Sequence, residues 1–284
     1  MTFLASAALA GIDLALVALP KCVMIRPLGR LGSPWFALAL PGSIAGTVLA
    51  ITLWPGAATA LGLLALLAVP ALAAFALGYV VHGARPLFVW LTPAAVLVGV
   101  TSAGAVVSGP LTVALTCLSA IGLAVLLLDV TPLHWLKIGI VAMSAVDVVL
   151  VATGVLGPVN NLLNNALSGT GLPQLQSITI GNVTEGYGDL FIASLLGGIV
   201  ASEHGPQLGI ALITGLLSLC LAALCLVVSI IPSTVPAAIA LLLLELSKPA
   251  GRLRGIATPL PPAPACWQPD SAVRLAAGVR SGEP

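Results

Sequence analysis

Long apolar runs, separated by short polar or glycine- and proline-containing segments, fill most of this chain. A helix that crosses the hydrocarbon core of a bilayer needs about 20 mostly apolar residues, and nine runs reach or approach that length. No run shows the strict apolar–polar alternation of a membrane β-barrel. The runs cover residues 3–20, 35–54, 59–81, 86–107, 111–129, 136–156, 188–203, 207–231 and 233–247. The pattern predicts an all-α, polytopic membrane protein with nine transmembrane helices.

Two of the segments outside these runs are long enough to need a separate interpretation. The connection 157–187 holds four asparagines and then the β-branched stretch Ser177–Ile180, which could form a short strand. Residues 248–284 are rich in Pro, Ala and Arg and read as a flexible tail. The predicted organisation is a nine-helix domain over 1–247 followed by this tail. Within the domain, helices one to six span about 3–156 and helices seven to nine about 188–247.

Composition agrees with a membrane protein. Of the 284 residues, 59% are hydrophobic and 7% are charged, whereas soluble domains carry roughly 25% charged residues. The net charge of +1 gives no sign of a nucleic-acid partner. Five scattered cysteines show no metal-ligand spacing, and we predict neither a metal nor an organic cofactor.

The apolar runs consist mainly of Ala, Leu, Val and Gly, which indicates a GC-rich prokaryotic gene and hence the plasma membrane. Small residues let helices approach closely, and residues 42–46 in the second run are a candidate for such packing.

The basic residues give the orientation. With nine spans, all ten fall after odd-numbered runs, on one side of the membrane; they are Lys21, Arg26, Arg30, Arg85, Lys137, Lys248, Arg252, Arg254, Arg274 and Arg280. Because cytoplasmic loops are enriched in Lys and Arg, we predict that this side is cytoplasmic. The N-terminus and the connection 157–187 would then lie outside and the C-terminal tail inside.

Four carboxylates lie in or beside the apolar runs. A carboxylate within a bilayer costs about 2.5–3.5 kcal/mol on insertion scales and marks a functional site by default. These residues are Asp13, Asp129, Asp147 and Asp189. Asp129 ends its run and can reach the interface, and Glu245 can pair with Lys248 at the inner edge. Asp13 sits mid-run without an obvious partner and could serve either packing or function.

Asp147 and Asp189 fall in the sixth run and at the start of the seventh. Antiparallel neighbouring helices would let the two carboxyl groups approach, and such a pair shares one proton. One carboxylate can then take a proton from water while its protonated partner polarises a carbonyl, as in aspartic proteases. Gly186 and Gly188 would let backbone approach a substrate. A helix start stabilised by an acidic residue is the alternative interpretation of the second motif.

The ordered motifs resemble those of the presenilin and signal peptide peptidase group of intramembrane aspartyl proteases. They comprise Asp147, Gly157-Pro158, the Gly-Tyr-Gly-Asp sequence at 186–189, and Val-Pro-Ala-Ala at 235–238. The resemblance implies a nine-helix, presenilin-like bundle with these motifs in helices six, seven and nine. Two positions depart from the family pattern: Val146 replaces a tyrosine and Ala238 replaces a leucine.

The resemblance implies an endopeptidase acting on transmembrane or signal-peptide-like segments. Asp147 and Asp189 would bind the catalytic water and alternate as general base and acid. Gly186, Tyr187, Gly188, Pro236 and Ala237 would contact substrate. We also expect an unwound substrate to pair as an added strand with Ser177, Ile178, Thr179 and Ile180.

Three alternatives remain open. A prepilin peptidase also uses Gly-x-Gly-Asp but expects a basic residue soon afterwards, where this chain has Leu190 and Phe191. An ion- or proton-coupled transporter could use Asp13, Asp147 and Asp189 as relay groups, although no inverted repeat is evident. An inactive homologue acting as a binding partner is the third.

Overall fold

The computed structural model describes residues 2–20, 33–54, 56–80, 105–167, 170, 172–181, 183–224 and 232–247. Most of the fourth predicted run, the end of the eighth and the predicted tail 248–284 lie outside these ranges. Lys137 is the one basic residue used in the orientation argument that lies within them.

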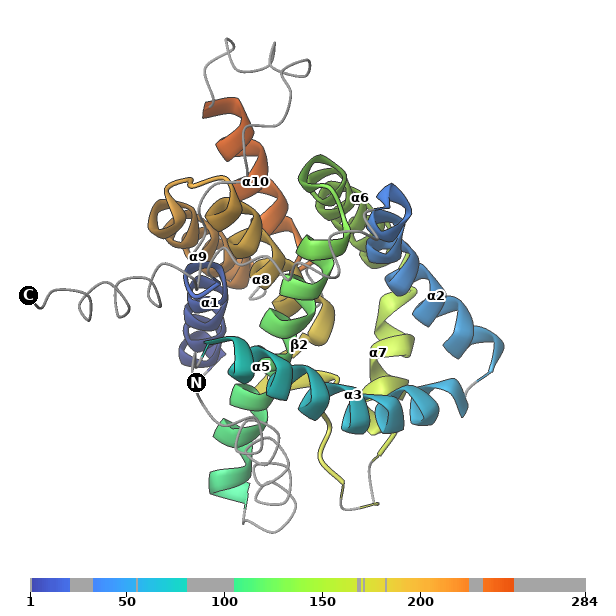
Figure 1. Cartoon of the computed structure of the whole chain (residues 1–284). Coiled ribbons are helices and arrows are strands. Elements are labelled where there is room, and N and C mark those ends of the chain that lie inside the picture. The colour runs from blue at the N-terminus through green and yellow to red at the C-terminus, as the bar shows by residue number, and fades with distance from the viewer. Residues whose placement is uncertain are drawn as a thin grey trace, which may run out of the picture.

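Helices dominate the described chain (Figure 1). In order, the elements are α1 (Thr2–Ala18), η2 (Pro34–Leu38), α2 (Ala39–Leu53), α3 (Gly56–Val80), α5 (Ala105–Val130), α6 (Leu133–Ala152), α7 (Leu156–Asn165), β1 (Ser177–Ile180), β2 (Val183–Gly186), α8 (Tyr187–Ser202), α9 (Gln207–Leu224) and α10 (Val235–Ser247).

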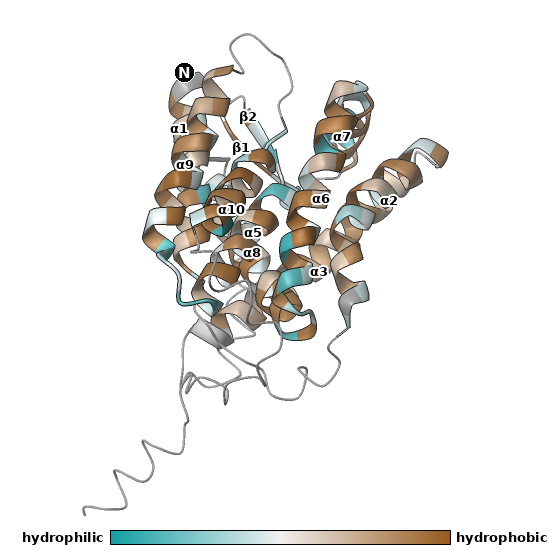
Figure 2. Ribbon diagram, turned by 90° about the horizontal axis from the view of Figure 1, so that it is seen from above, coloured by the Kyte–Doolittle hydropathy of each residue, from teal (hydrophilic) through white to brown (hydrophobic). Residues whose placement is uncertain are grey.

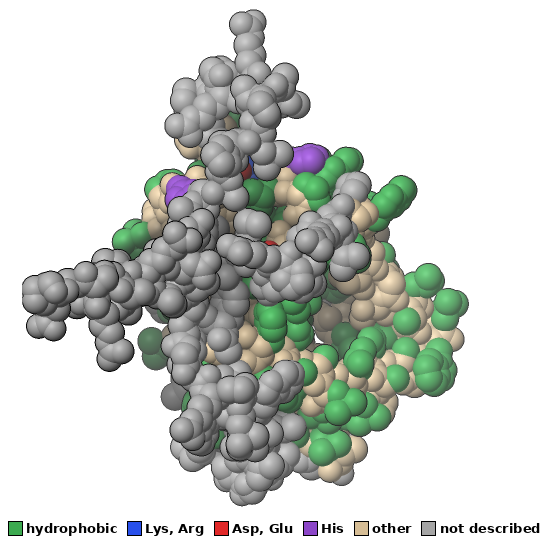
Figure 3. Space-filling model, in the orientation of Figure 1, with side chains coloured by type: hydrophobic (Ala, Val, Ile, Leu, Met, Phe, Trp, Pro, Cys, Tyr) green, Lys and Arg blue, Asp and Glu red, His purple; other side chains and the backbone are tan. Residues whose placement is uncertain are grey.

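Five stretches are long and apolar enough to cross a membrane, which agrees with the predicted helical membrane protein. They are Trp35–Leu53, Gly56–Leu77, Gly109–Val130, Leu133–Ala152 and Gln207–Leu224. The helices α1, α8 and α10 are apolar but shorter. Apolar residues cover the described helices on most sides (Figure 2), and hydrophobic side chains are exposed over α2 and α3 (Figure 3). Such a surface suits lipid rather than water.

The core is built around α8. Every residue from Leu190 to Val200 is buried, and the helix packs against α1, α5, α9 and α10. A helix that is apolar on all sides is buried in a protein core or lies in a membrane, and the neighbours of α8 place it in the core. Around this centre α1 packs against α9, α3 against α5, and α2 against α6; Figure 1 shows α3 crossing α5.

Glycine permits the tightest contacts between the described helices. A side chain at Gly197 of α8 would overlap the backbone of Val17 in α1, and one at Gly122 of α5 would overlap the backbone of Leu72 in α3. A Cβ at Gly42 or Gly46 would meet no described atom within 4 Å. The candidate packing at residues 42–46 is thus not seen among the described residues, and most of the fourth predicted run lies outside them.

The connection 157–187 contains more regular structure than predicted. Its first part is the helix α7, which packs against α2 and α3. The predicted strand over Ser177–Ile180 is confirmed as β1, and it pairs antiparallel with β2, with Ser177 opposite Gly186 and Ile180 opposite Val183. Gly181 turns the hairpin with a φ of 63°, a conformation that glycine adopts without strain.

A cluster of three charged side chains joins the start of α6 to the ends of α8 and α10. Lys137, near the start of α6, pairs with Glu203, just after α8, and with Glu245, near the end of α10, the latter at 2.6 Å. The predicted pair of Glu245 with Lys248 cannot be compared directly, because Lys248 lies outside the described residues. Because the start of α6 meets the ends of α8 and α10, α6 runs antiparallel to both.

Candidate active site

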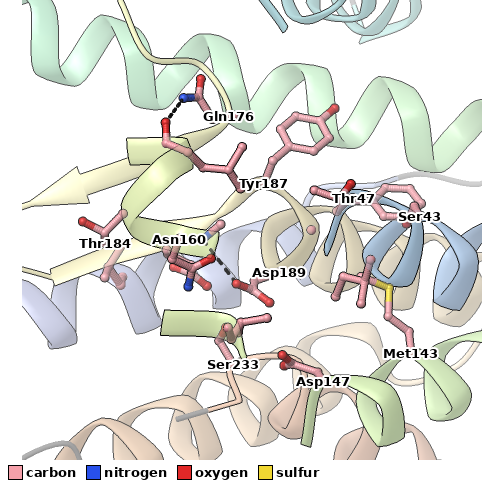
Figure 4. Close-up of a pocket in the computed structure, with 18 of the residues that line it drawn as sticks. Ser43, Thr47, Met143, Asp147, Asn160, Gln176, Thr184, Tyr187, Asp189 and Ser233 are labelled. Atoms are coloured by element: carbon pink, nitrogen blue, oxygen red, sulfur yellow. Dashed lines mark hydrogen bonds between the residues drawn. The ribbon is translucent and has the colours of Figure 1, made fainter. Parts of the chain in front are cut away.

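A cavity of about 1090 Å³ lies in the helix bundle and is lined by residues of α1, α2, α3, α5, α6, α7, α8, α9 and the hairpin. Its wall includes both predicted catalytic residues, Asp147 and Asp189. Figure 4 shows their carboxyl groups pointing toward the same space from different helices. Gly157, Gly186, Tyr187, Gly188 and Pro236 also line the cavity.

A residue of the segment that precedes α10 hydrogen-bonds to Asp147. Asp147 is 3% exposed, and its Oδ2 accepts a hydrogen bond from the Thr234 hydroxyl at 2.8 Å. Ser144, one turn earlier on α6, donates its hydroxyl to the Thr234 backbone oxygen at 3.0 Å. Two hydrogen bonds thus fix Thr234 against the face of α6 that carries Asp147.

Asp189 occupies the first turn of α8. Its Oδ2 accepts a hydrogen bond from the Gly186 backbone N–H at 3.2 Å, which completes the helix N-terminus. Ser233, which also lines the cavity, lies beside the same side chain (Figure 4). Asp189 therefore stabilises the start of α8, as the alternative interpretation of the sequence suggested, and it also lines the cavity.

Ser233 and Thr234 connect the two aspartates. Neighbouring hydroxyls reach Asp189 and Asp147 respectively, and the chain then enters α10 through Val235. We did not predict these two residues as part of the site. A sequence signal was available: two hydroxyl residues stand directly before the proline motif of the ninth run.

The remaining predicted substrate contacts are divided between cavity and core. Gly188 packs against Met143 of α6, where an added Cβ would come within 3.3 Å of the methyl group. Tyr187 lines the cavity, and its hydroxyl accepts a hydrogen bond from Ser119 of α5 at 2.8 Å. Ala237 is 4% exposed within α10, and in contrast to Pro236 it is not part of the described cavity wall.

The hairpin meets the cavity through β2. Val183, Thr184, Glu185 and Gly186 belong to the cavity wall, whereas Ser177, Ile178, Thr179 and Ile180 of β1 do not line the part that the structure describes. Ile178 is instead buried in the core, at 1% exposure. Each strand of a two-stranded ladder keeps one edge unpaired by the other, and the strand at the cavity is β2.

Two further carboxylates line the same cavity. Asp13 of α1 is the residue whose role the sequence left open, and its Oδ2 accepts a hydrogen bond from Ser218 of α9 at 2.7 Å. Glu185 of β2 was not predicted; it is 7% exposed and hydrogen-bonds to Asp13. Burial raises the pKa of Glu185 well above its usual range, and the charges of Asp13 and Asp189 raise it further. Glu185 therefore tends to hold a proton.

Within the described segments, no three His, Cys, Asp or Glu side chains are arranged to hold a metal ion. Comparisons with known proteins add no family assignment: no family model matches this chain, nor does any curated protein or solved structure.

Proposed function

We propose that this protein is an intramembrane aspartyl endopeptidase of the presenilin and signal peptide peptidase type. It would hydrolyse peptide bonds within transmembrane or signal-peptide-like segments of other proteins. The observation that supports this most directly is the pair Asp147 and Asp189, which line one cavity from two helices. Thr234 hydrogen-bonds Asp147, and its neighbour Ser233 lies beside Asp189. Carboxylates placed within apolar helices are costly and are expected to serve a function.

The proposed chemistry follows from a shared proton. One aspartate, as carboxylate, takes a proton from a water between the pair, while the other, protonated, donates a hydrogen bond to the scissile carbonyl. Attack by the water gives a tetrahedral intermediate, and transfer of a proton to the amide nitrogen then releases the amine. Because the two groups alternate as base and acid, neither requires a metal or a cofactor.

Substrate must unwind before it can react, because a transmembrane helix satisfies its own backbone hydrogen bonds. In our proposal the hairpin edge receives the unwound backbone as an added strand. The sequence suggested Ser177–Ile180 for this role, and the presence of residues 183–186 in the cavity wall favours β2. Pro236 would line the opposite side.

We further propose the complete nine-helix bundle in a prokaryotic plasma membrane, with the N-terminus outside and the C-terminus in the cytoplasm. The Lys137 cluster is consistent with this part of the proposal, because helix six of such a bundle must run antiparallel to helices seven and nine, as α6 does to α8 and α10.

Removal of either dyad carboxyl tests the proposal. We expect Asp147→Asn and Asp189→Asn each to reduce cleavage of a reporter transmembrane segment by at least about 10³-fold, since the general acid–base pair is lost. Cleavage is measured by mass spectrometry with purified protein in vesicles. Asp129→Asn is the control, because Asp129 is not part of the described cavity wall. This variant should cleave the reporter at the wild-type rate. Turnover by either dyad variant at the wild-type rate would refute the assignment.

An ion- or proton-coupled transporter is the second candidate, and the place of Asp13 in the cavity favours it. Transport needs relay carboxylates but no scissile substrate. Uptake driven by a proton gradient in vesicles, without cleavage of any reporter, would select this function instead.

A further inference from the structure

A second polar cluster lies in the cavity wall beside the proposed dyad. Asp13 and Glu185, each 7% exposed, are hydrogen-bonded to one another, and Ser218 donates its hydroxyl to Asp13 at 2.7 Å. Asp13 lies on α1, Glu185 on β2 and Ser218 on α9. Both helices, α1 and α9, consist mainly of apolar residues. Helix packing alone gives no reason to bring two carboxylates together here, because each must be desolvated.

Glu185 is incompletely satisfied. Its Oε2 has no hydrogen-bond partner among the described residues, although Glu185 lines the cavity. Buried polar atoms in proteins are nearly always hydrogen-bonded, and an unpaired one is destabilising. With the shared proton on the oxygen that faces Asp13, Oε2 remains an acceptor, and an N–H or O–H donor on a group bound in the cavity would satisfy it.

The charge of the carboxyl pair indicates whether the hydrogen-bond donor is neutral or cationic. Two carboxyl groups in contact hold one proton between them, so the Asp13–Glu185 pair keeps a negative charge near neutral pH. No Lys, Arg or His side chain belongs to the described cavity wall to balance it. A cationic donor would satisfy both the unpaired oxygen and the charge.

We propose that Asp13, Glu185 and Ser218 form a subsite for a lysine or arginine side chain of the transmembrane substrate. This inference rests on the proposed protease function and adds a substrate class to it. The methylene stem of such a side chain can lie along the apolar wall formed by Leu9, Ala10 and Leu221, with its charge at the carboxyl pair. A substrate without the cation leaves a buried acceptor unpaired, and a site of that kind discriminates strongly.

Matched reporters test the subsite. A lysine, an arginine or a glutamine is placed in turn at each position of one transmembrane reporter, and kcat/KM is measured for each. We expect one position at which wild-type protein prefers lysine and arginine over glutamine by at least about 10-fold. In Glu185→Gln this ratio should fall toward 1, whereas the control Asp129→Asn should keep it. No preference at any position in wild-type protein would overturn the inference, whether or not the Glu185 variant folds.

A binding measurement separates this inference from the protease itself. Asp147→Asn protein is irradiated with photo-crosslinking reporters that carry lysine or glutamine at the tested positions. Stronger crosslinking of the lysine reporter supports the subsite even if no reporter is cleaved, in which case only the proposed activity fails. Equal crosslinking of the two reporters at every position would refute the subsite.

Discussion

At the scale of single residues, Thr234 has the clearest link to the proposed chemistry. Its side chain is 1% exposed and its hydroxyl donates to Asp147 at 2.8 Å. Thr234→Val keeps the shape but removes this donor. A hydrogen bond to a charged group contributes about 1.5–3 kcal/mol, so we expect kcat to fall roughly 10- to 100-fold. KM should change little, because Thr234 is not part of the described cavity wall.

The measurement is kcat and KM on a single reporter segment. Thr234→Ser retains the hydroxyl and should retain most of the activity, which separates the hydrogen bond from general packing. An equal loss in the serine and valine variants would contradict a positioning role for the hydroxyl.

Some residues of the candidate site can be predicted from the sequence, and others cannot. Asp147 and Asp189 could be predicted because a carboxylate in an apolar run is rare and calls for an explanation. Glu185 could not, because it lies in a polar connection where a charged residue is ordinary. Ser233 and Thr234 were missed for a related reason: hydroxyl residues are common near helix starts, and only the fold shows which carboxyl groups they reach.

At the scale of elements, Gly197 determines how closely α8 and α1 approach. An added Cβ there would overlap the backbone of Val17, which cannot move without shifting the helix. We expect Gly197→Ala to destabilise the protein by about 1–3 kcal/mol, the usual effect of overpacking a core. The measurement is the thermal unfolding midpoint in a fixed detergent.

Gly46→Ala is the matched control, because a Cβ at Gly46 meets no described atom within 4 Å. Alanine is also the better helix former by up to about 1 kcal/mol, so this variant should be as stable as wild type or more so. If both substitutions lowered the midpoint equally, the close contact between α8 and α1 would not explain the effect at Gly197.

Element positions were largely predictable where composition alone determines them. The described helices α1, α3, α5, α6 and α8 each lie within a few residues of a predicted run, because a bilayer requires long apolar stretches. The helix α7 was not predicted, since its asparagines indicate a loop in an otherwise apolar chain. The strand β2 was missed because Val-Thr-Glu-Gly has little strand character without its partner β1.

At the scale of the whole molecule, the direction of each helix can be tested against the cluster formed by Lys137, Glu203 and Glu245. These residues bring the start of α6 to the ends of α8 and α10, and the hairpin lies at the opposite end of α8. In the proposed orientation, which follows the positive-inside rule, the Lys137 end is cytoplasmic. The dyad would then lie toward the outer side, near the connection through which α7 and the hairpin reach the cavity.

Site-directed cysteine labelling tests this arrangement in intact cells. In a chain whose five native cysteines are replaced, Leu172→Cys should react with a membrane-impermeant maleimide from outside, because Leu172 is 40% exposed and precedes the hairpin. Ser247→Cys, at the exposed end of α10, should react only after permeabilisation. The reverse pattern would invert the membrane orientation while keeping the fold. Labelling of both sites from the same side would instead break the antiparallel relation on which the nine-helix proposal depends, because the hairpin and the end of α10 would then share one face of the membrane.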